Sequence, residues 1–246
     1  MRLAVIADTH GNLIALEAVI ADIKTHAPDE IVDLGDCVSG PLWPRETADL
    51  LMSLKLPTAR GNHDRTVVSD PLGKMEASDA YTAPRLDAHH RDWLAALPLT
   101  CSPCDGVLAC HGNPADDNGF LVDALAPGHG FVLAPRVEIA ARLDLVASPV
   151  VLCGHTHVPR VVWLERAGSS QLVVNPGSVG LPAFVFSGQA FQCGAPHARY
   201  AVLTQRSGHW QADLKTVVYD WAKSSKQAAA NGRQDWATGL LTGYAC

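Results

Sequence analysis

Short apolar runs alternate with segments of helical spacing along the first half of the chain. The stretch Leu3–His10 begins with an apolar run free of glycine and proline and ends abruptly in polar residues, which is typical of a strand buried on both faces. From Asn12 to about His26 apolar residues recur at helical spacing, which predicts a helix. The same criteria predict strands over residues 31–34, 56–59, 107–110 and 150–153, and helices over residues 44–54, 86–97 and 135–145.

The second half of the chain is richer in predicted strands. Antiparallel strands are expected over residues 161–164, 171–174, 200–203 and 211–218, followed by a helical tail from Asp220 that frays at Asn231-Gly232. The pattern weakens between Arg65 and Ala83, and residues 115–130, rich in Asp, Gly and Pro, predict an irregular loop over a site. Because no repeat or long linker interrupts the pattern, residues 1–246 are interpreted as one α/β domain on a shared two-sheet core.

Composition narrows the class of protein. The formal net charge of -6 argues against binding of nucleic acid over a broad surface, because such binding needs clustered Lys and Arg. The first apolar run is short for a signal peptide and carries Asp8, and the apolar segments fall below the roughly 20 residues that span a bilayer, so a cytoplasmic protein without membrane contact is expected. The seven cysteines are odd in number and scattered through apolar stretches, so most are interpreted as small buried residues.

Residues able to bind metal stand at the ends of five apolar runs. They are Asp8 and His10, Asp36, Asn62 and His63, His111, and His155 and His157. If the strands share a sheet their ends converge, and residues two apart in an extended chain can reach one ion together. Oxygen donors mixed with imidazoles favour Mn, Fe or Zn, and the set suffices for two ions, with Asp36 as the natural bridge. A single two-residue motif is weak, and for Asp8 the alternative is a cap of the following helix.

Five ordered motifs carry a resemblance to a known family. They are Asp8-x-His10, Gly35-Asp36, Gly61-Asn62-His63-Asp64, Cys110-His111-Gly112 and Gly154-His155-Thr156-His157. Together they resemble the calcineurin-like metallophosphoesterase superfamily, and residues 175–180 are similar to the segment that follows in its small bacterial phosphodiesterase (YfcE-like) branch. The resemblance implies a four-layer α/β/β/α sandwich, two packed mixed sheets flanked by helices, with a binuclear metal centre. By analogy one ion would be held by Asp8, His10, Asp36 and His157, and the other by Asp36, Asn62, His111 and His155, with His63 outside the metal shell.

A centre of this kind suits hydrolysis of a phosphate ester. Two cations roughly 3.5 to 4 Å apart can share a hydroxide, grip two phosphoryl oxygens and offset the charge that builds up in an in-line displacement. The departing oxygen needs a proton or a positive neighbour, and His63 is a candidate for either role; Asn62 and His63 are expected to contact the substrate. Asp64 is expected to hydrogen-bond His63 and fix its tautomer, with a helix cap as the alternative role.

The residues after the second motif narrow the substrate. Protein phosphatases and symmetrical dinucleoside-tetraphosphate hydrolases of the superfamily carry Asp-Arg-Gly there, whereas residues 35–41 of this chain read Gly-Asp-Cys-Val-Ser-Gly-Pro and lack that arginine. A phosphodiesterase or a general small phosphoesterase is therefore favoured over a protein phosphatase, and a small phosphoester, most of all a phosphodiester, is the expected substrate and partner. The alternatives are a protein or dinucleoside-polyphosphate phosphatase, and a binding scaffold of the same fold without turnover. The scaffold has no need of His63 as an unliganded histidine beside a metal pair, which favours the enzyme.

Other candidate residues carry weaker signals. Cys101 and Cys104 have C-x-x-C spacing but open no helix, so a turn with two thiols is favoured over a redox centre. His89 and His90 are expected to be exposed on their helix, and His129 to be a solvated loop residue. Asn175 and Ser178 are interpreted as parts of a structural turn that supports the site only secondarily.

Overall fold

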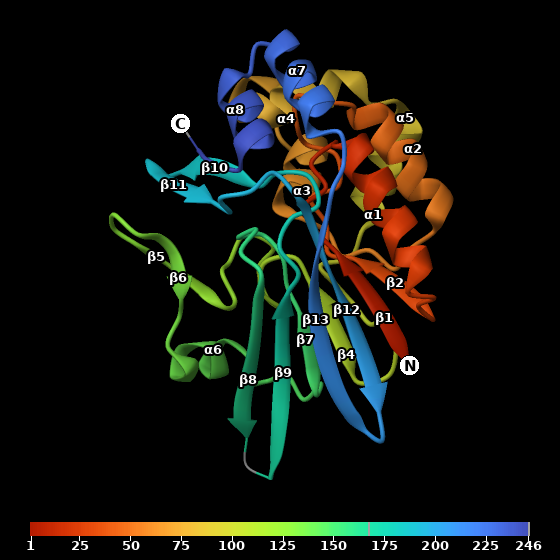
Figure 1. The fold of residues 1–246 in the computed structure, drawn as a ribbon, viewed down its shortest axis with the longest axis vertical. Helices are drawn as coiled ribbons and strands as arrows, with labels where there is room; N and C mark the ends of the chain where they lie inside the picture. Colours follow the sequence, from red (N-terminus) through yellow and green to blue (C-terminus); the bar gives the residue numbers. More distant parts are fainter. Residues whose placement is uncertain (167, 246) are drawn as a thin grey trace.

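The computed structural model describes residues 1–166 and 168–245, and its core is a pair of β-sheets packed face to face (Figure 1). The first sheet has the strand order β13-β12-β1-β2, with β1 (Arg2–Ile6), β2 (Glu30–Asp33), β12 (Ala198–Arg206) and β13 (His209–Val217). The second has the order β3-β4-β7-β9-β8, with β3 (Thr100–Cys101), β4 (Val107–Cys110), β7 (Val150–Leu152), β8 (Arg160–Arg166) and β9 (Ser169–Asn175).

Strand β1 is buried on both faces, as its continuous apolar run predicts. Leu3 and Val5 point into the core between the sheets, whereas Ala4 and Ile6 point outward into the core under the helices. β1 runs parallel to β2 and antiparallel to β12, and β7 runs parallel to both β4 and β9. The carboxyl ends of the parallel strands therefore meet at one end of each sheet, where polar side chains can collect.

Helices cover the outer face of each sheet and complete the four layers that the resemblance implied. The first sheet is covered by α1 (Leu13–Thr25), α2 (Pro44–Leu54) and α5 (Ala88–Ala96), and the second by α6 (Arg136–Arg142). Ile139 and Leu143 of the α6 region pack on Val151 and Val173 of the second sheet. Asn12 caps α1 by accepting a hydrogen bond from the backbone N–H of Ala15.

The weakly patterned segment after residue 60 contains short helices. They are α3 (Asn62–Ser69), η1 (Leu72–Lys74), α4 (Ala77–Thr82) and η2 (Ala83–Arg85). The predicted strand over residues 56–59 is reduced to a bridge between Asp33 and Thr58. The tail forms two helices, α7 (Trp221–Ala230) and α8 (Gln234–Thr242), which separate at Asn231-Gly232, where fraying was predicted.

Two hairpins lie outside the core sheets, side by side at one edge of the molecule (Figure 1). They are β5 (Asp123–Ala126) with β6 (Gly130–Leu133), and β10 (Ala183–Phe186) with β11 (Gln189–Gln192). The prediction of an irregular loop over residues 115–130 is therefore wrong in its second part. Each strand has only four residues, too few for an alternation to stand out, and the second hairpin turns at Ser187-Gly188, both with positive φ.

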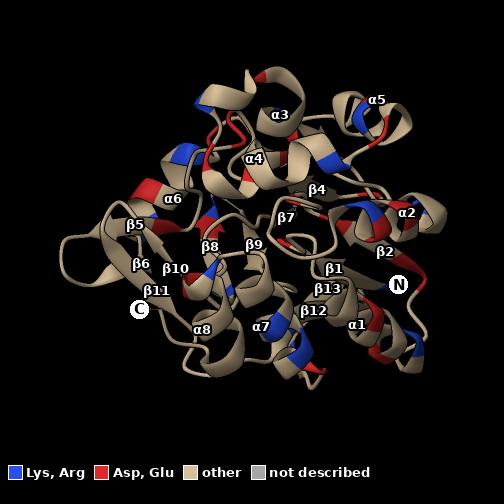
Figure 2. Cartoon of the chain, turned by 90° about the horizontal axis from the view of Figure 1, so that it is seen from above, with Lys and Arg blue, Asp and Glu red and all other residues tan. Residues whose placement is uncertain are grey.

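Charged side chains of both signs are interspersed over the helices (Figure 2). Among the described residues, none of the helices combines the length and apolarity that crossing a membrane requires. Six cysteines are free thiols, of which Cys37, Cys110 and Cys153 are buried, as predicted for small apolar residues, whereas Cys246 lies outside the described residues.

Candidate metal centre

The seven predicted ligands converge where the core strands end. They are Asp8, His10, Asp36, Asn62, His111, His155 and His157, and this set is called the candidate metal centre below. Five of them, all except Asn62 and His111, have a left-handed backbone with φ between 50° and 69°. Residues other than glycine rarely adopt that conformation, and such strain clusters at functional sites. The turns after the strands are therefore bent to bring these side chains together.

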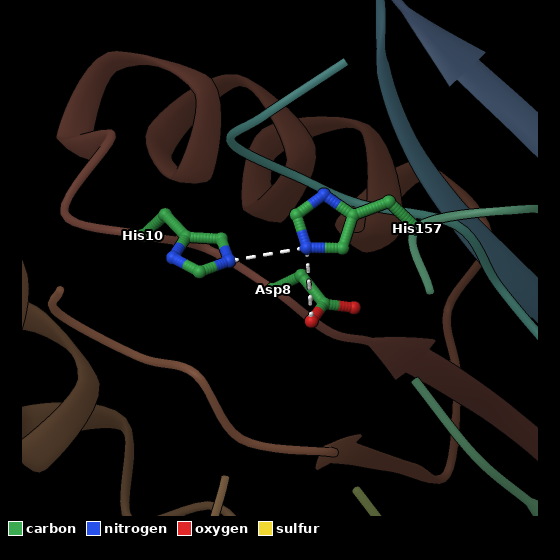
Figure 3. A group of neighbouring side chains, drawn as sticks. All are labelled: Asp8, His10 and His157. Carbon is green, nitrogen blue, oxygen red and sulfur yellow. Dashed lines mark hydrogen bonds and ion pairs between the residues drawn. The ribbon is translucent and has the colours of Figure 1, made fainter. Parts of the chain in front are cut away.

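Asp8, His10 and His157 form the first cluster (Figure 3). The Nε2 atoms of His10 and His157 are 3.1 Å apart, and Nε2 of His157 is 3.4 Å from Oδ1 of Asp8. Both rings donate Nδ1–H to a backbone carbonyl, His10 to Ser39 and His157 to Leu181, each at 2.8 Å. Their Nε2 lone pairs therefore face each other and the carboxylate, an arrangement that a cation satisfies.

Asp36, His111 and His155 form the second cluster. Nε2 of His111 is 3.2 Å from Oδ2 of Asp36 and 3.2 Å from Oδ1 of Asn62. His111 donates its Nδ1–H to the carbonyl of Leu34, so three acceptor atoms converge here as well. Oδ2 of Asp36 also lies 3.7 Å from Nε2 of His10 in the first cluster, which places Asp36 between the two groups.

The electrostatics of the two clusters fit bound cations. Oδ2 of Asp8 and Nε2 of His155 are buried without a hydrogen-bond partner, an unfavourable state for a carboxylate and an imidazole. Burial opposes ionisation of Asp36, yet the positive charges of protonated His111 and His63 hold the pKa of Asp36 well below its usual value, and a cation would take the place of the His111 proton. Burial lowers the pKa of His155 to about 3, so this ring offers an unprotonated nitrogen. Anionic carboxylates, a neutral imidazole and buried acceptor atoms without a hydrogen-bond partner are the ligands that a metal site requires.

The loop before α3 is folded tightly around Asp36. A side chain at Gly61 would bring its Cβ to 2.1 Å from Oδ1 of Asp36, so only glycine fits at this close approach. The same oxygen accepts a hydrogen bond from the backbone N–H of His63 at 3.0 Å. This packing brings the start of α3, with Asn62 and His63, against the second cluster.

Asp64 has a different contact from the one expected. Its carboxylate accepts the backbone N–H groups of Gly61, Asp36 and Cys37, each at 2.9 Å, and so caps α3 and joins the loop to the turn after β2. The predicted hydrogen bond to His63 is wrong, because adjacent residues on a helix point in different directions. The alternative prediction, that Asp64 caps a helix, is confirmed.

The partner of His63 is Asp79 on α4, which the sequence did not suggest. His63 donates Nδ1–H to Oδ1 of the buried Asp79 at 2.8 Å, and Asp79 also accepts a hydrogen bond from Ser39 Oγ. Burial opposes the charged imidazole, but Asp36 and the hydrogen bond to Asp79 raise the pKa of His63 to about 9. Nε2 of a protonated His63 is then free to act as a donor at the edge of the cluster. Asp79 lies in a segment without clear periodicity, and no signal in the sequence could have linked it to His63.

The turn that follows β9 supports both ligand loops. Asn175 donates to the carbonyl of Gly154 at 2.8 Å, and Ser178 donates to the carbonyl of Asp8 at 2.8 Å. The predicted supporting role of these two residues is confirmed, since each one fixes the backbone next to a ligand.

The weaker candidates lie apart from the candidate metal centre. The prediction that His90 is exposed is wrong, because its ring is buried and its Nδ1 accepts the N–H of Asp87, which leaves Nε2–H to donate to Asp49 at 2.9 Å. Although it forms a cluster with Asp49 and His89, His90 thus has no free lone pair for a metal. His129 is exposed in the turn between β5 and β6. Burial raises the pKa of Cys101 to about 11, the opposite of a redox-active thiol.

Comparison with known proteins gives this geometry a family context. A sequence profile of the calcineurin-like phosphoesterase superfamily domain matches residues 1–193. An uncharacterized protein of Methanocaldococcus jannaschii is 26% identical over 257 residues, covering 95% of this chain and 94% of that protein. The crystal structure of a metallophosphoesterase from Sphaerobacter thermophilus superposes with a TM-score of 0.76 at 27% identity, covering 99% of this chain and 100% of the other.

A putative diadenosine tetraphosphatase shares the fold with a TM-score of 0.53 at 18% identity, covering 87% of this chain and 93% of that one. The profile match spans all seven residues of the candidate metal centre, which the structure brings together in the two clusters described above. The chain belongs to the calcineurin-like phosphoesterase superfamily.

Proposed function

We propose that this protein is a binuclear metal-dependent phosphohydrolase that cleaves phosphodiesters. The observation that carries the proposal is the pair of three-residue clusters, joined by Asp36 of the second cluster, which also lies close to His10 of the first, with a charged histidine beside them. Asp8, His10 and His157 would hold one ion, His111, His155 and Asn62 the other, and Asp36 both. The mixture of oxygen and imidazole donors suits Mn, Fe or Zn.

When bound, two cations would make a water acidic enough to attack at neutral pH and would offset charge on the phosphoryl oxygens. The chain's own residues supply the remaining steps. His63 donates a proton from Nε2 to the departing oxygen, since the hydrogen bond from Nδ1 to Asp79 fixes the ring and its charge. Asn62, held beside His111, lies where it can contact the phosphoryl group. Asp64 shapes the loop and takes no part in proton transfer.

The preference for diesters rests on the sequence after Asp36. Residues 35–41 lack the arginine that protein phosphatases and symmetrical dinucleoside-tetraphosphate hydrolases of the superfamily carry there. The resemblance of the other motifs to the phosphodiesterase branch favours the same substrate class. The likeness to a putative diadenosine tetraphosphatase is one of fold alone at 18% identity, so it adds no support for that substrate. The paired His63 and Asp79 favour turnover over a binding scaffold, because a scaffold gains nothing from an oriented, charged histidine.

Chelation with metal add-back tests the proposal. The purified protein should contain two metal ions per chain by elemental analysis, lose hydrolysis of phosphodiesters when they are removed, and regain it with Mn, Fe or Zn. A panel of matched diesters and monoesters should give higher kcat/KM for the diesters. Full turnover with metal confirmed absent would overturn the metal dependence, and a preference for monoesters would overturn the substrate class.

A further inference from the structure

All five phenylalanines of the chain gather beside the candidate metal centre, in contact with one another through their rings. They are called the phenylalanine wall here, and they are Phe120, Phe131, Phe184, Phe186 and Phe191. Their ring centroids lie 5.1 to 6.4 Å from those of their neighbours in the wall. Four of the five stand on the two hairpins outside the core sheets, and Phe120 precedes the first hairpin.

The phenylalanine wall adjoins the ligands directly. The ring of Phe120 stacks on His155 with centroids 5.4 Å apart and an interplanar angle of 26°. Phe184 lies 4.6 Å from His157, the corresponding ligand of the first cluster. The wall therefore contacts a ligand of each cluster, Phe120 in the second and Phe184 in the first. A group bound against the wall could belong to the same substrate as a phosphoryl group at the candidate metal centre.

The wall also forms one side of the cavity that opens at the centre. The cavity has a volume of about 420 Å³, and Phe120, Phe131, Phe184 and Phe186 line it while remaining only half-buried. Half-buried rings leave apolar surface against water, and covering that surface is favourable. Residues 183–192, which form the second hairpin, carry no charged side chain and are drawn in tan in Figure 2.

The rest of the cavity lining is more polar. Charged side chains of both signs line it from α3, the segment that follows it, and the start of α8, beside the indole of Trp236; they are Arg65, Asp70, Lys74, Glu76, Asp79, Arg233 and Asp235. A substrate that fills this space therefore needs a phosphate at the candidate metal centre, an apolar planar face toward the wall, and polar edges toward the charged residues of the lining. Aromatic rings in contact prefer offset or edge-to-face partners, and half-exposed phenylalanines offer such faces to a ligand ring.

We infer that the phenylalanine wall is the binding site for a planar aromatic group of the substrate, so that the enzyme selects phosphoesters that carry an aryl or nucleobase ring. This inference rests on the proposed function, since it takes the candidate metal centre as the phosphoryl site. Stacking of a base on an aromatic side chain typically strengthens binding by about 5- to 100-fold.

Three phosphonates that cannot be hydrolysed at phosphorus test the inference by calorimetry on the metal-loaded protein. They are methylphosphonate, cyclohexylphosphonate and phenylphosphonate, which share the anionic group and differ in the substituent. Phenylphosphonate should bind about 5- to 100-fold more tightly than methylphosphonate and more tightly than cyclohexylphosphonate, which has similar bulk but no aromatic face. AMP compared with ribose 5-phosphate extends the test to a nucleobase, and a gain for phenylphosphonate alone would assign the wall to simple aryl groups.

Substitutions in the wall locate the effect. Phe186→Leu and Phe131→Leu keep apolar bulk and should lower the affinity for phenylphosphonate more than that for methylphosphonate. Val132→Ala is the matched control, since its side chain alternates to the opposite face of β6 from Phe131, and it should leave the affinity ratio unchanged. Equal affinities for phenylphosphonate and cyclohexylphosphonate, or equal losses in the leucine variants, would overturn the aromatic site. Failure of all three phosphonates to bind would instead show that the candidate metal centre is not a phosphoryl site, so the proposed function itself fails.

Discussion

The candidate metal centre and the phenylalanine wall border the same cavity but are built in different ways. Six of the seven ligands stand on turns that follow strands of the core sheets, whereas Asn62 begins α3. The rings of His111, His10 and His157 are fixed by hydrogen bonds to the backbone carbonyls of Leu34, Ser39 and Leu181. The wall stands on two hairpins outside those sheets, held to each other by contacts such as the one from the N–H of Gly130 to Gln189.

This difference separates the chemistry from the choice of substrate. A centre anchored in two buried sheets keeps its geometry whatever the substrate, because moving one ligand means moving a core strand. A hairpin at the edge can change length and sequence without disturbing the core. Changes at the centre should therefore lower the turnover of every phosphoester, whereas changes in the wall should alter which phosphoesters are used.

Asp36→Asn should give the largest loss, a fall of several orders of magnitude in turnover for all substrates alike. The carboxylate of Asp36 lies close to His111 of its own cluster and to His10 of the other, and an asparagine amide carries no negative charge for either ion. The fold should persist, because an amide oxygen can still accept the N–H of His63. Turnover, metal content and circular dichroism measured on one preparation check the prediction. Near-native rates with both metals bound would remove the bridging role.

His63→Ala should reduce turnover by about a hundred- to ten-thousandfold, the usual contribution of a positioned general acid, while metal content stays constant. The loss should be smallest for esters whose departing alcohol is already acidic and largest for alkyl alcohols. Rates for a series of graded leaving groups, with metal measured on the same samples, test both parts. The exposed His89→Ala serves as the control for loss of an imidazole. A uniform loss across the series argues against proton donation, and loss of metal in step with activity would make His63 a ligand.

Asp79→Asn should have a smaller effect, a loss of about 10- to 100-fold, because it acts only through His63. Removing this carboxylate lowers the pKa of His63, which Asp79 helps to raise to about 9. Since the reaction needs protonated His63, activity should be lost at lower pH in the variant, and the alkaline limb of the kcat profile should move to lower pH. Asp70→Asn, an exposed acid on the same cavity, is the control that should leave the profile in place. An unmoved alkaline limb in Asp79→Asn would limit Asp79 to a structural role.

Asp79 and the wall also mark the limit of what the sequence predicts. The seven ligands could be found because each follows an apolar run in the sequence, so a local pattern and a residue type together indicate both place and chemistry. Asp79 lies on a helix of six residues, 16 positions from His63, and their meeting depends on how α3 and α4 fold back on each other. Asp64 shows the converse error, since adjacency in sequence suggested a contact that helix geometry prevents.

The same limit applies to the larger elements. Most strands of the two core sheets could be predicted from continuous apolar runs, because they are buried on both faces, and helices α1, α2, α5 and α6 from helical periodicity. The two short hairpins do not, since four-residue strands at the surface carry little alternation. The wall that they form brings together phenylalanines from residues 120–191, and only the tertiary fold determines that these rings meet.

The smallest effect on turnover is expected for Asp33→Asn, at a buried carboxyl group in β2 that belongs to neither region. Burial, together with the neighbouring charges of Asp64 and Asp8, raises the pKa of Asp33 to about 8. Oδ1 accepts the N–H of Gly35 at 3.0 Å, and an asparagine oxygen can replace it. Only the weak contact from Sγ of Cys37 to Oδ2 at 3.7 Å is lost, so the variant should keep its turnover within about twofold.

Stability should nevertheless reveal the substitution through its dependence on pH. In the unfolded chain Asp33 loses its proton near pH 4, whereas in the fold it keeps the proton up to about pH 8. The unfolded state thus binds fewer protons across this interval, so the contribution of Asp33 to the free energy of unfolding is present below pH 4 and is lost as the pH rises toward 8. Asparagine does not titrate, so Asp33→Asn should gain stability relative to the wild type, by about 1.4 kcal/mol for each pH unit between pH 4 and 8. Urea unfolding of the chelated proteins between pH 5 and 8 measures the difference, with the exposed Asp105→Asn as the control for loss of one charge. Parallel curves for Asp33→Asn and the wild type would mean that the buried carboxyl group ionises like an exposed one, and that the core beneath the candidate metal centre is more polar than its packing indicates.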